Sequence, residues 1–335
     1  PLVSLSYKHP ASAGCFFSSK LNLTDKKERQ MFKKLMLSLL LGSAVVSNVW
    51  ALEDKDMPYI NPDEGRIGEV RRVEDNTEFK VCADPDNMPY SNLKQEGFED
   101  KIAAVLAQEL GKKLTFQYAY YRQGFLRNTL NANRCDVVMS TTADNDSMRT
   151  TNPYYRSGYV YVWRKSSNYN IKDWDSPDLR RGIIGIVGQS PPSRPLHDHG
   201  LMENARPYRM QRDLNFPPSQ LIDDLVKGDI DIAIVWGPIA GYFAKNASIP
   251  LEVAMIPEYE NTNVHGKENW NIAIGVRHKD KARQQEINGA LERRKADIDK
   301  ILDEYGVPHI PIVAGDDLVK KAREVNESAK VDKPL

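Results

Sequence analysis

The 335-residue sequence has little cysteine, no excess of charge of either sign and no hydrophobic run long enough to cross a membrane. Its 46 lysines and arginines balance 46 aspartates and glutamates, so no basic surface indicates nucleic-acid binding. The longest apolar run, Leu35–Val46, is too short and too interrupted to span a bilayer. With 41% hydrophobic residues, the chain still has ample material for a globular core.

Patterns of catalytic or metal-binding residues are also scarce. No Ser/His/Asp or Cys/His arrangement indicates an enzyme. Two neighbouring histidines, His197 and His199, lack the further ligands that a metal site requires. The sequence therefore predicts neither a catalyst nor a protein with a metal or cofactor.

An export signal precedes the globular part. Residues 31–51 contain a lysine pair, an apolar stretch and the small-residue site Val49-Trp50-Ala51, which together are typical of a cleaved secretory signal. Residues 1–30 show no periodicity, and we interpret them as spurious upstream sequence. We therefore expect a mildly acidic protein of the periplasm that begins at Leu52 and is not inserted in the membrane.

Export changes what the three cysteines imply. Cys15 lies upstream of the expected signal, which leaves Cys82 and Cys135 in the exported chain. An oxidising compartment favours a disulfide between these two. Two buried thiols are the alternative, because free cysteine is one of the most buried residue types. The disulfide requires the two Cα atoms to lie within about 7 Å.

One pattern occurs twice in the chain. The segments LNANRCDVVM (130–139) and LVKGDIDIAI (225–234) each have a leucine, a helix stop three residues later and an aspartate six residues later that opens an apolar strand. The stops are Asn133 and Gly228, residue types that tolerate the left-handed conformation at the end of a helix. The apolar runs are typical of buried parallel strands. The repeat predicts two similar α/β lobes.

The flanking segments continue the alternation of strands and helices. In the first half we expect strands at 79–85, 113–118 and 158–165, and helices from Phe98 to Gly111 and over 124–132. In the second half a strand and a glycine turn precede Ser190 as a helix N-cap and Pro191 as the first helical residue. A returning strand and one long helix follow from Trp270 onward.

These elements predict an α/β fold of two lobes, each a mainly parallel sheet flanked by helices. The chain crosses between the lobes near residues 165 and 260, and two such crossovers form a hinge around a cleft. The expected division assigns 77–164 and 262–312 to the first lobe, 165–261 to the second lobe and 313–335 to a charged C-terminal tail.

Residues 77–312 resemble the family 3 extracellular solute-binding proteins, the periplasmic receptors of polar amino acid ABC transporters. Five segments carry the resemblance: GFEDKIAAVLAQELG, NRCDVVMSTTA, NPYYRSGYVYVWR, LVKGDIDIAIVW and LDEYG. The resemblance implies the type II periplasmic binding protein fold.

A narrower resemblance lies in VCADPDNMPYSN, EGFEDKIA, RQGFLRNTLNANRCDVVM and VWGP. These segments are similar to MxaJ/XoxJ-type proteins, which are encoded with pyrroloquinoline-quinone (PQQ) methanol dehydrogenases. This resemblance implies an accessory factor of methanol oxidation whose partner is methanol dehydrogenase or its assembly components.

The residues that hold an amino acid in such receptors are replaced in this chain. The arginine that clamps the ligand carboxylate corresponds to Asp144, and the aspartate that binds the ligand ammonium corresponds to Trp236. A carboxylate facing Asp144 would be repelled. Arg149 lies five residues further on, at a variable position of the family. An ordinary amino acid is therefore not the expected ligand.

Polar and aromatic residues at the strand ends are expected to line the cleft. They are Asp84, Asn87, Tyr90, Ser140, Thr141, Asp144, Tyr154, Gln189, Ser190 and Trp236. Such a lining suits a small neutral or cationic organic molecule, because aromatic rings offer apolar faces and cation–π contacts. Alternatively, the aromatic side chains pack the cleft shut.

Three functions remain open. The first is the accessory role through a protein surface, and the second is a transport receptor for a small solute other than an amino acid. The third is an enzyme like the cyclohexadienyl dehydratases, with Asp84 and Asp144 as acid and base. The third is weakest, because the carboxylate-binding arginine of those enzymes is missing. We favour the first.

Overall fold

The computed structural model describes residues 72–143, 145–209, 215–257 and 268–313. The expected signal, the 30 residues before it, Asp144 and all but the first residue of the expected tail lie outside these ranges. The chain divides into two units, Pro1–Gly65 and Arg66–Leu335. Everything that follows concerns the described residues of the second unit.

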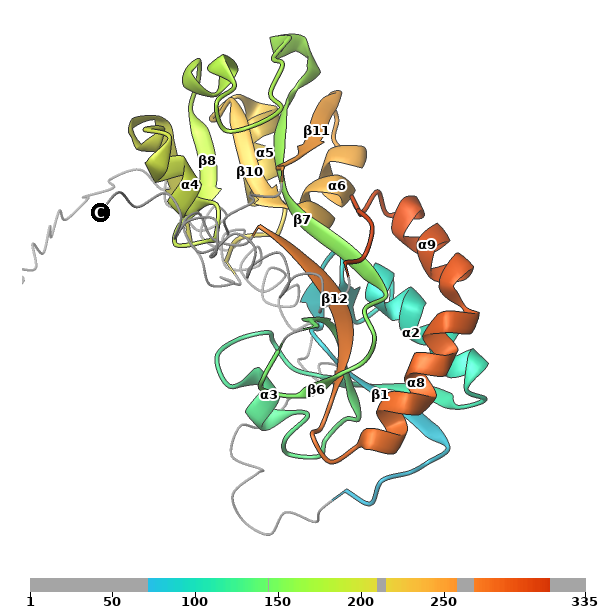
Figure 1. Ribbon diagram of the computed structural model, residues 1–335. Helices are drawn as coiled ribbons and strands as arrows, with labels where there is room; N and C mark the ends of the chain where they lie inside the picture. The colour runs from blue at the N-terminus through green and yellow to red at the C-terminus, as the bar shows by residue number, and fades with distance from the viewer. Residues whose placement is uncertain (1–71, 144, 210–214, 258–267, 314–335) are drawn as a thin grey trace, which may run out of the picture. The chain divides into compact units, whose positions relative to one another are not determined.

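A ten-stranded sheet runs through this unit in the order β4-β1-β5-β12-β7-β10-β8-β9, with β11 beside β7 and β6 beside β12 (Figure 1). Its strands are β1 (Glu78–Ala83), β4 (Lys113–Tyr118), β5 (Val137–Thr142), β6 (Arg149–Thr150), β7 (Tyr155–Arg164), β8 (Ile184–Val187), β9 (Ala205–Tyr208), β10 (Ile232–Trp236), β11 (Leu251–Met255) and β12 (Asn269–Val276). The short strands β2 (Asp86–Asn87) and β3 (Ser91–Asn92) pair separately. The α-helices are α2 (Phe98–Glu109), α3 (Phe125–Asn128), α4 (Ser193–Asp198), α5 (Gln220–Lys227), α6 (Gly237–Lys245), α8 (Lys281–Arg293) and α9 (Lys295–Glu304).

Strand β7 joins two groups of parallel strands. Its first residues, Tyr155–Gly158, pair with β12, and its later residues, Tyr159–Trp163, pair with β10. On the β12 side, β1 is parallel to both β4 and β5. On the β10 side, β8 is parallel to both β9 and β10. The first group with its helices is called the first lobe below, and the second group is called the second lobe.

Each lobe has its own hydrophobic core. In the first lobe, Phe98, Ile102 and Leu106 of α2 are fully buried in the cluster that also contains residues of β1 and β5. In the second lobe, β7 supplies Val160 to one cluster and Tyr161 to another. Because successive side chains of a strand point to opposite faces, this strand is buried on both sides. The expected α/β class, with mainly parallel strands flanked by helices, is confirmed.

Both stop residues of the repeat have a left-handed backbone, with φ = 60° at Asn133 and φ = 88° at Gly228. Gly228 ends α5 and donates its N–H to the carbonyls of Asp224 and Leu225. Asn133 lies in a turn five residues after the end of α3, so it does not end a helix as expected.

The aspartates of the repeat, Asp136 and Asp231, lie one residue before β5 and β10 rather than within them. Each pairs with an arginine from a distant part of the chain. Arg72 donates from Nη1 and Nη2 to the two carboxylate oxygens of Asp136, both at 3.1 Å. Arg164 Nη2 donates to Asp231 Oδ1 at 2.6 Å. These ion pairs hold the two carboxylates at the starts of β5 and β10.

Two predicted helices are shorter than expected. The helix expected over 124–132 is only Phe125–Asn128, because the Thr129 hydroxyl donates to the Phe125 carbonyl at 2.7 Å and the chain leaves helical geometry there. The helix expected to begin at Pro191 begins at Ser193. The Ser190 hydroxyl donates to the Val187 carbonyl at 2.6 Å and so caps no helix.

The long helix expected after β12 is two helices. Arg294, with φ = −105° and ψ = 16°, separates α8 from α9. Its guanidinium is held by Asp297 at 2.6 Å and Glu109 at 3.6 Å. The chain turns at this residue so that α9 also packs against α2 (Figure 1).

Cys82 and Cys135 form a disulfide, with their Cα atoms 5.4 Å apart. The bond links β1 to the residue two positions before β5. Both cysteines are buried in a cluster with Phe125 and Leu130. The expected pairing is therefore present, and the bond ties the centre of the first lobe to the first repeat strand.

Removing this disulfide is expected to lower the free energy of unfolding by about 2–4 kcal/mol, because the bond restricts the unfolded chain across a loop of 53 residues. Urea denaturation of the oxidised protein, the reduced protein and the Cys82→Ala/Cys135→Ala variant measures this loss. Alkylation of the unreduced protein should add no label by intact mass. Equal unfolding free energies in all three samples would contradict the expectation.

Candidate functional site

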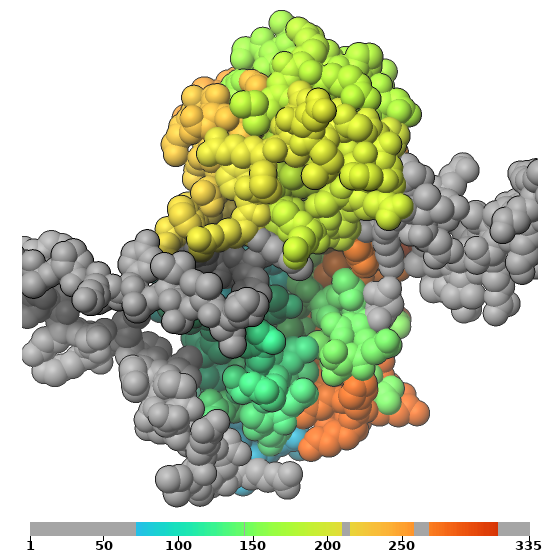
Figure 2. All heavy atoms as spheres, turned by 90° about the vertical axis from the view of Figure 1, so that its left-hand side faces the viewer, coloured from blue at the N-terminus to red at the C-terminus, as the bar shows by residue number. Residues whose placement is uncertain are grey.

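A cavity of about 1440 Å³ opens between the two lobes. The recess between the yellow-green second lobe and the blue-green first lobe is visible in Figure 2. The first lobe lines it with the carboxyl ends of β1 and β5 and the start of α2, and the second lobe with residues of β9, β10 and α6. Ligands bind at the carboxyl ends of strands in open α/β sheets, so this cavity is the candidate site.

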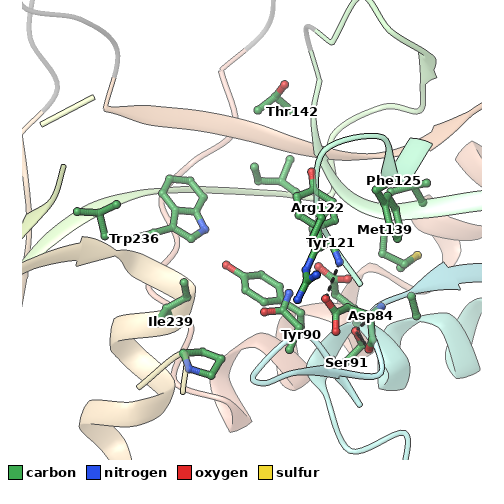
Figure 3. Close-up of a pocket in the computed structure, with 18 of the residues that line it drawn as sticks. Asp84, Tyr90, Ser91, Tyr121, Arg122, Phe125, Met139, Thr142, Trp236 and Ile239 are labelled. Carbon is green, nitrogen blue, oxygen red and sulfur yellow. Dashed lines mark hydrogen bonds between the residues drawn. The ribbon is translucent and has the colours of Figure 1, made fainter. Parts of the chain in front are cut away.

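One wall of the cavity is aromatic. Tyr159 of β7, Trp236 at the end of β10 and Trp270 of β12 meet edge to face, with ring centroids 5.5–6.1 Å apart. Tyr90 of the first lobe lies next to Trp236 in Figure 3, and both side chains line the cavity. We call these four residues the aromatic wall. It draws on both lobes and on β7 and β12, the two strands between them.

Asp84 stands at the mouth of β1 and is only 4% exposed. Its Oδ1 accepts a hydrogen bond from the Asp86 N–H at 2.9 Å, and its Oδ2 accepts one from the Tyr121 N–H at 2.7 Å (Figure 3). A buried carboxylate satisfied by backbone donors fixes the shape of the loops around it. Asp84 therefore holds the rim segment that follows β4 against the end of β1.

A second carboxyl, Glu99, lies in the first turn of α2 and lines the cavity. Its side chain is partly buried, and burial raises the pKa of Glu99 to about 8. The nearby Ser140 hydroxyl favours the ionised form but offsets only part of that rise. Within the described residues, no ion pair compensates Glu99. The cavity floor therefore carries a carboxyl that takes up or loses its proton near pH 8.

Tyrosines surround Glu99. Burial raises the pKa values of Tyr90, Tyr121 and Tyr155, and the negative charge of Glu99 raises each of them further. Ser140, beside it, has φ = 46°, a left-handed backbone that a serine rarely adopts within a strand. Backbone strain of this kind often accompanies a functional site.

Positive charge is confined to the rim of the cavity. Arg122 and Arg127, which follow β4, are exposed, and so is Arg209, which follows β9. The Arg122 guanidinium stacks 5.4 Å from the ring centre of Tyr120. The cavity thus has a basic rim and an acidic, aromatic floor.

Five of the expected site residues line the cavity: Asp84, Asn87, Tyr90, Ser140 and Trp236. The other described ones do not. The Thr141 hydroxyl accepts from Asn145, the Ser190 hydroxyl donates to Val187, and Gln189 is exposed in the turn after β8. Tyr154 is 5% exposed and lies behind the lining, with its hydroxyl 3.1 Å from Ser140 Oγ. Asp144 lies outside the described residues.

Most of the lining was not foreseen from the sequence, and the missed residues include Glu99, Tyr155, Tyr159 and Trp270. Strand alternation carried a usable signal for two of them, because Tyr155 and Tyr159 are four residues apart in β7 and so share a face. Arg149, which was considered as a substitute anchor, donates from Nε to the His278 carbonyl at 2.9 Å and does not line the cavity.

Within the described part of the chain, no helix is both long and apolar enough to cross a membrane. No group of three or more metal-ligating side chains occurs there either.

Comparison with known proteins places the fold in a family. The profile of the bacterial extracellular solute-binding proteins, family 3, matches residues 79–308. MoxJ of Methylorubrum extorquens is 30% identical over 247 residues, which cover 70% of this chain and 82% of MoxJ. The crystal structure of MxaJ from Methlophaga aminisulfidivorans is 31% identical with a TM-score of 0.63, covering 69% of this chain and all of MxaJ. The periplasmic binding protein XoxJ from Methylobacterium extorquens is 35% identical with a TM-score of 0.59, covering 70% of this chain and all of XoxJ. The chain belongs to the family 3 bacterial extracellular solute-binding proteins and has their two-lobed type II fold.

Proposed function

We propose that this chain is a periplasmic accessory protein of the PQQ-dependent methanol dehydrogenase system and acts by binding a protein rather than by catalysis. The observation that carries the proposal is its similarity to MoxJ, MxaJ and XoxJ over about 70% of its length. The expected secretory signal at residues 31–51 supports export to the periplasm. Methanol dehydrogenase, or a component of its assembly, is the proposed partner.

The residues of the cleft argue against an amino acid as the ligand. The position where the family binds the ligand ammonium holds Trp236, whose indole packs on Tyr159 and Trp270. Arg149 is tied to a backbone carbonyl. An amino acid that entered the cavity would meet aromatic rings where its ammonium needs a carboxylate.

A transport receptor for another small solute is the second candidate function. The observation that favours it is the open cavity of about 1440 Å³, which the aromatic side chains do not fill. An enzyme is less well supported. Asp84, the proposed acid or base, already accepts two backbone hydrogen bonds and is almost fully buried.

A binding experiment with purified components tests the accessory role. We expect the tagged mature chain to retain quinoprotein methanol dehydrogenase, in its apo or holo form, on an affinity column and in size-exclusion chromatography. The Trp236→Ala variant should retain it equally, because the proposed contact does not use the cleft. A family 3 amino-acid receptor with the same tag is the control. Absence of a complex with either form of the dehydrogenase would contradict the proposal.

A further inference from the structure

The floor of the cleft combines an uncompensated carboxyl with a set of aromatic rings. We propose that it binds an organic cation of the quaternary ammonium or alkylammonium class, with Glu99 as the counter-ion and the aromatic wall as the enclosure. This site is independent of the proposed accessory role, because it needs only the cavity and the residues that line it.

The carboxyl supplies the first part of the argument. A carboxylate removed from water is stable only when a positive charge or several hydrogen bonds compensate it. Glu99 has the Ser140 hydroxyl and, within the described residues, no cationic partner. Glu99 borders the cavity rather than packed core. A cation that enters the cavity would provide the missing charge.

The rings supply the second part. Tyr90 lies near enough to Glu99 to feel its charge, and both side chains line the same cavity as Trp236. Tyr159 and Trp270 contact Trp236 edge to face and complete the aromatic wall. Aromatic faces attract alkylated cations, and several rings around one cation are the usual means of recognising quaternary ammonium groups.

The distribution of charge selects against an anion at the floor. Asp84 and Glu99 are the acidic groups of the lining, whereas its arginines, Arg122, Arg127 and Arg209, are all exposed. An anion would be attracted to the rim but repelled by the floor. A compact cation without a carboxylate suits the acidic groups of the floor.

Choline and its neutral isostere 3,3-dimethylbutan-1-ol form a matched pair of probes with one shape and different charge. Tryptophan fluorescence and calorimetry at pH 9 are expected to show choline binding at least roughly tenfold tighter than the isostere. Glu99→Gln should weaken choline binding by a similar factor and leave the isostere unaffected. Glu109→Gln, the same change at the other end of α2 and outside the cavity lining, should change neither.

The pH dependence gives an independent readout. Because the pKa of free Glu99 is about 8, the affinity for choline should rise roughly tenfold from pH 7 to pH 9.5 and then level off. The pKa of Asp100, about 6, lies below this range, and Tyr90, Tyr155 and Tyr159 have raised values above it. Arginines stay charged throughout.

Glu268, next to Tyr159, also has a pKa of about 8, so Glu268→Gln is the control that should keep the pH profile of choline binding.

The outcomes separate cleanly. Choline binding that exceeds isostere binding, depends on Glu99 and rises with pH supports the site. Equal affinity for the two probes, no binding of choline up to about 10 mM, or a pH profile that survives Glu99→Gln overturns it. The comparison of probes on the unaltered protein remains decisive if Glu99→Gln does not fold. Failure of dehydrogenase binding would leave this result unchanged.

Discussion

Deletion of the gene for this chain is expected to abolish methanol-dependent growth and methanol dehydrogenase activity in periplasmic extract. Complementation with Trp236→Ala is expected to restore both. The physical reason is that an accessory protein contacts its partner through the outside of its lobes, whereas a receptor concentrates its affinity in a few buried aromatic contacts. A variant of the aromatic wall therefore distinguishes the two functions.

The choice of variant follows from the structure. Tyr154→Ala would remove a side chain that is 5% exposed and packed in the core of the first lobe, so its loss would report on folding. Trp236 is only partly buried and faces the cavity, so its truncation is the better test. Circular dichroism and urea denaturation of the purified variant establish that it folds.

Growth on methanol, dehydrogenase activity and solute uptake are measured in each strain. Loss of both methanol phenotypes on deletion, with rescue by Trp236→Ala, supports the accessory role. If the deletion leaves dehydrogenase activity and growth intact but abolishes uptake of one solute, the accessory role is wrong and the receptor alternative stands.

Periodicity and residue type predicted most of the fold. The first strand group could be predicted because β4 is Lys113–Tyr118, as expected, and β1 differs from the expected strand by only one or two residues at each end. The left-handed backbone at Asn133 and Gly228 was predictable because few residue types accept a positive φ. Helix ends that depend on one side-chain hydrogen bond, such as the bond from the Thr129 hydroxyl at the end of α3, could not be predicted.

The candidate site was predictable only where the family pattern or a strand end marked it. Trp236 ends β10, and Asp84 follows β1, so each stands at a strand mouth. Glu99 was missed because it lies in the first turn of α2. The apolar spacing of that helix predicts which side faces the core but does not show that its first turn borders the cavity. The sequence predicted Tyr154 rather than its neighbour Tyr155 as a lining residue. Adjacent residues of an extended segment point to opposite sides, and only the pairing of Tyr155 with β12 shows which of the two faces the cavity.

Asp136→Asn is expected to destabilise the protein by roughly 3–5 kcal/mol at pH 7, because the change removes the centre of a buried ionic cluster. Asp136 is 1% exposed, and its oxygens lie 3.1 Å from Arg72, 3.2 Å from Arg277 and 3.5 Å from Arg283. Asparagine has nearly the same shape but no charge, so three arginines at the base of β5 would lose a shared partner.

The repeat supplies the control for this experiment. Asp231 occupies the corresponding position before β10 and pairs with Arg164 at 2.6 Å, but its side chain is 31% exposed. Water screens such a pair, so Asp231→Asn should cost only about 1–2 kcal/mol. Urea denaturation of both variants at pH 7 compares them. Equal losses would show that burial of the cluster at Asp136 contributes nothing beyond an ordinary ion pair.

The pH dependence of the difference between wild type and Asp136→Asn identifies its electrostatic origin. Burial alone raises the pKa of Asp136, but the hydrogen bonds and charges of Arg72, Arg283 and Arg277 outweigh burial and hold it below its usual value. A carboxyl with a depressed pKa in the folded state stabilises the fold above the pKa of the unfolded chain, about 4, and this contribution is lost as the pH falls through the folded value. The difference between the two proteins should therefore be constant from pH 8 to about pH 5 and shrink below about pH 4. A difference that stays constant into acid would mean that packing at the entrance of β5, rather than the charge of Asp136, holds the first lobe together.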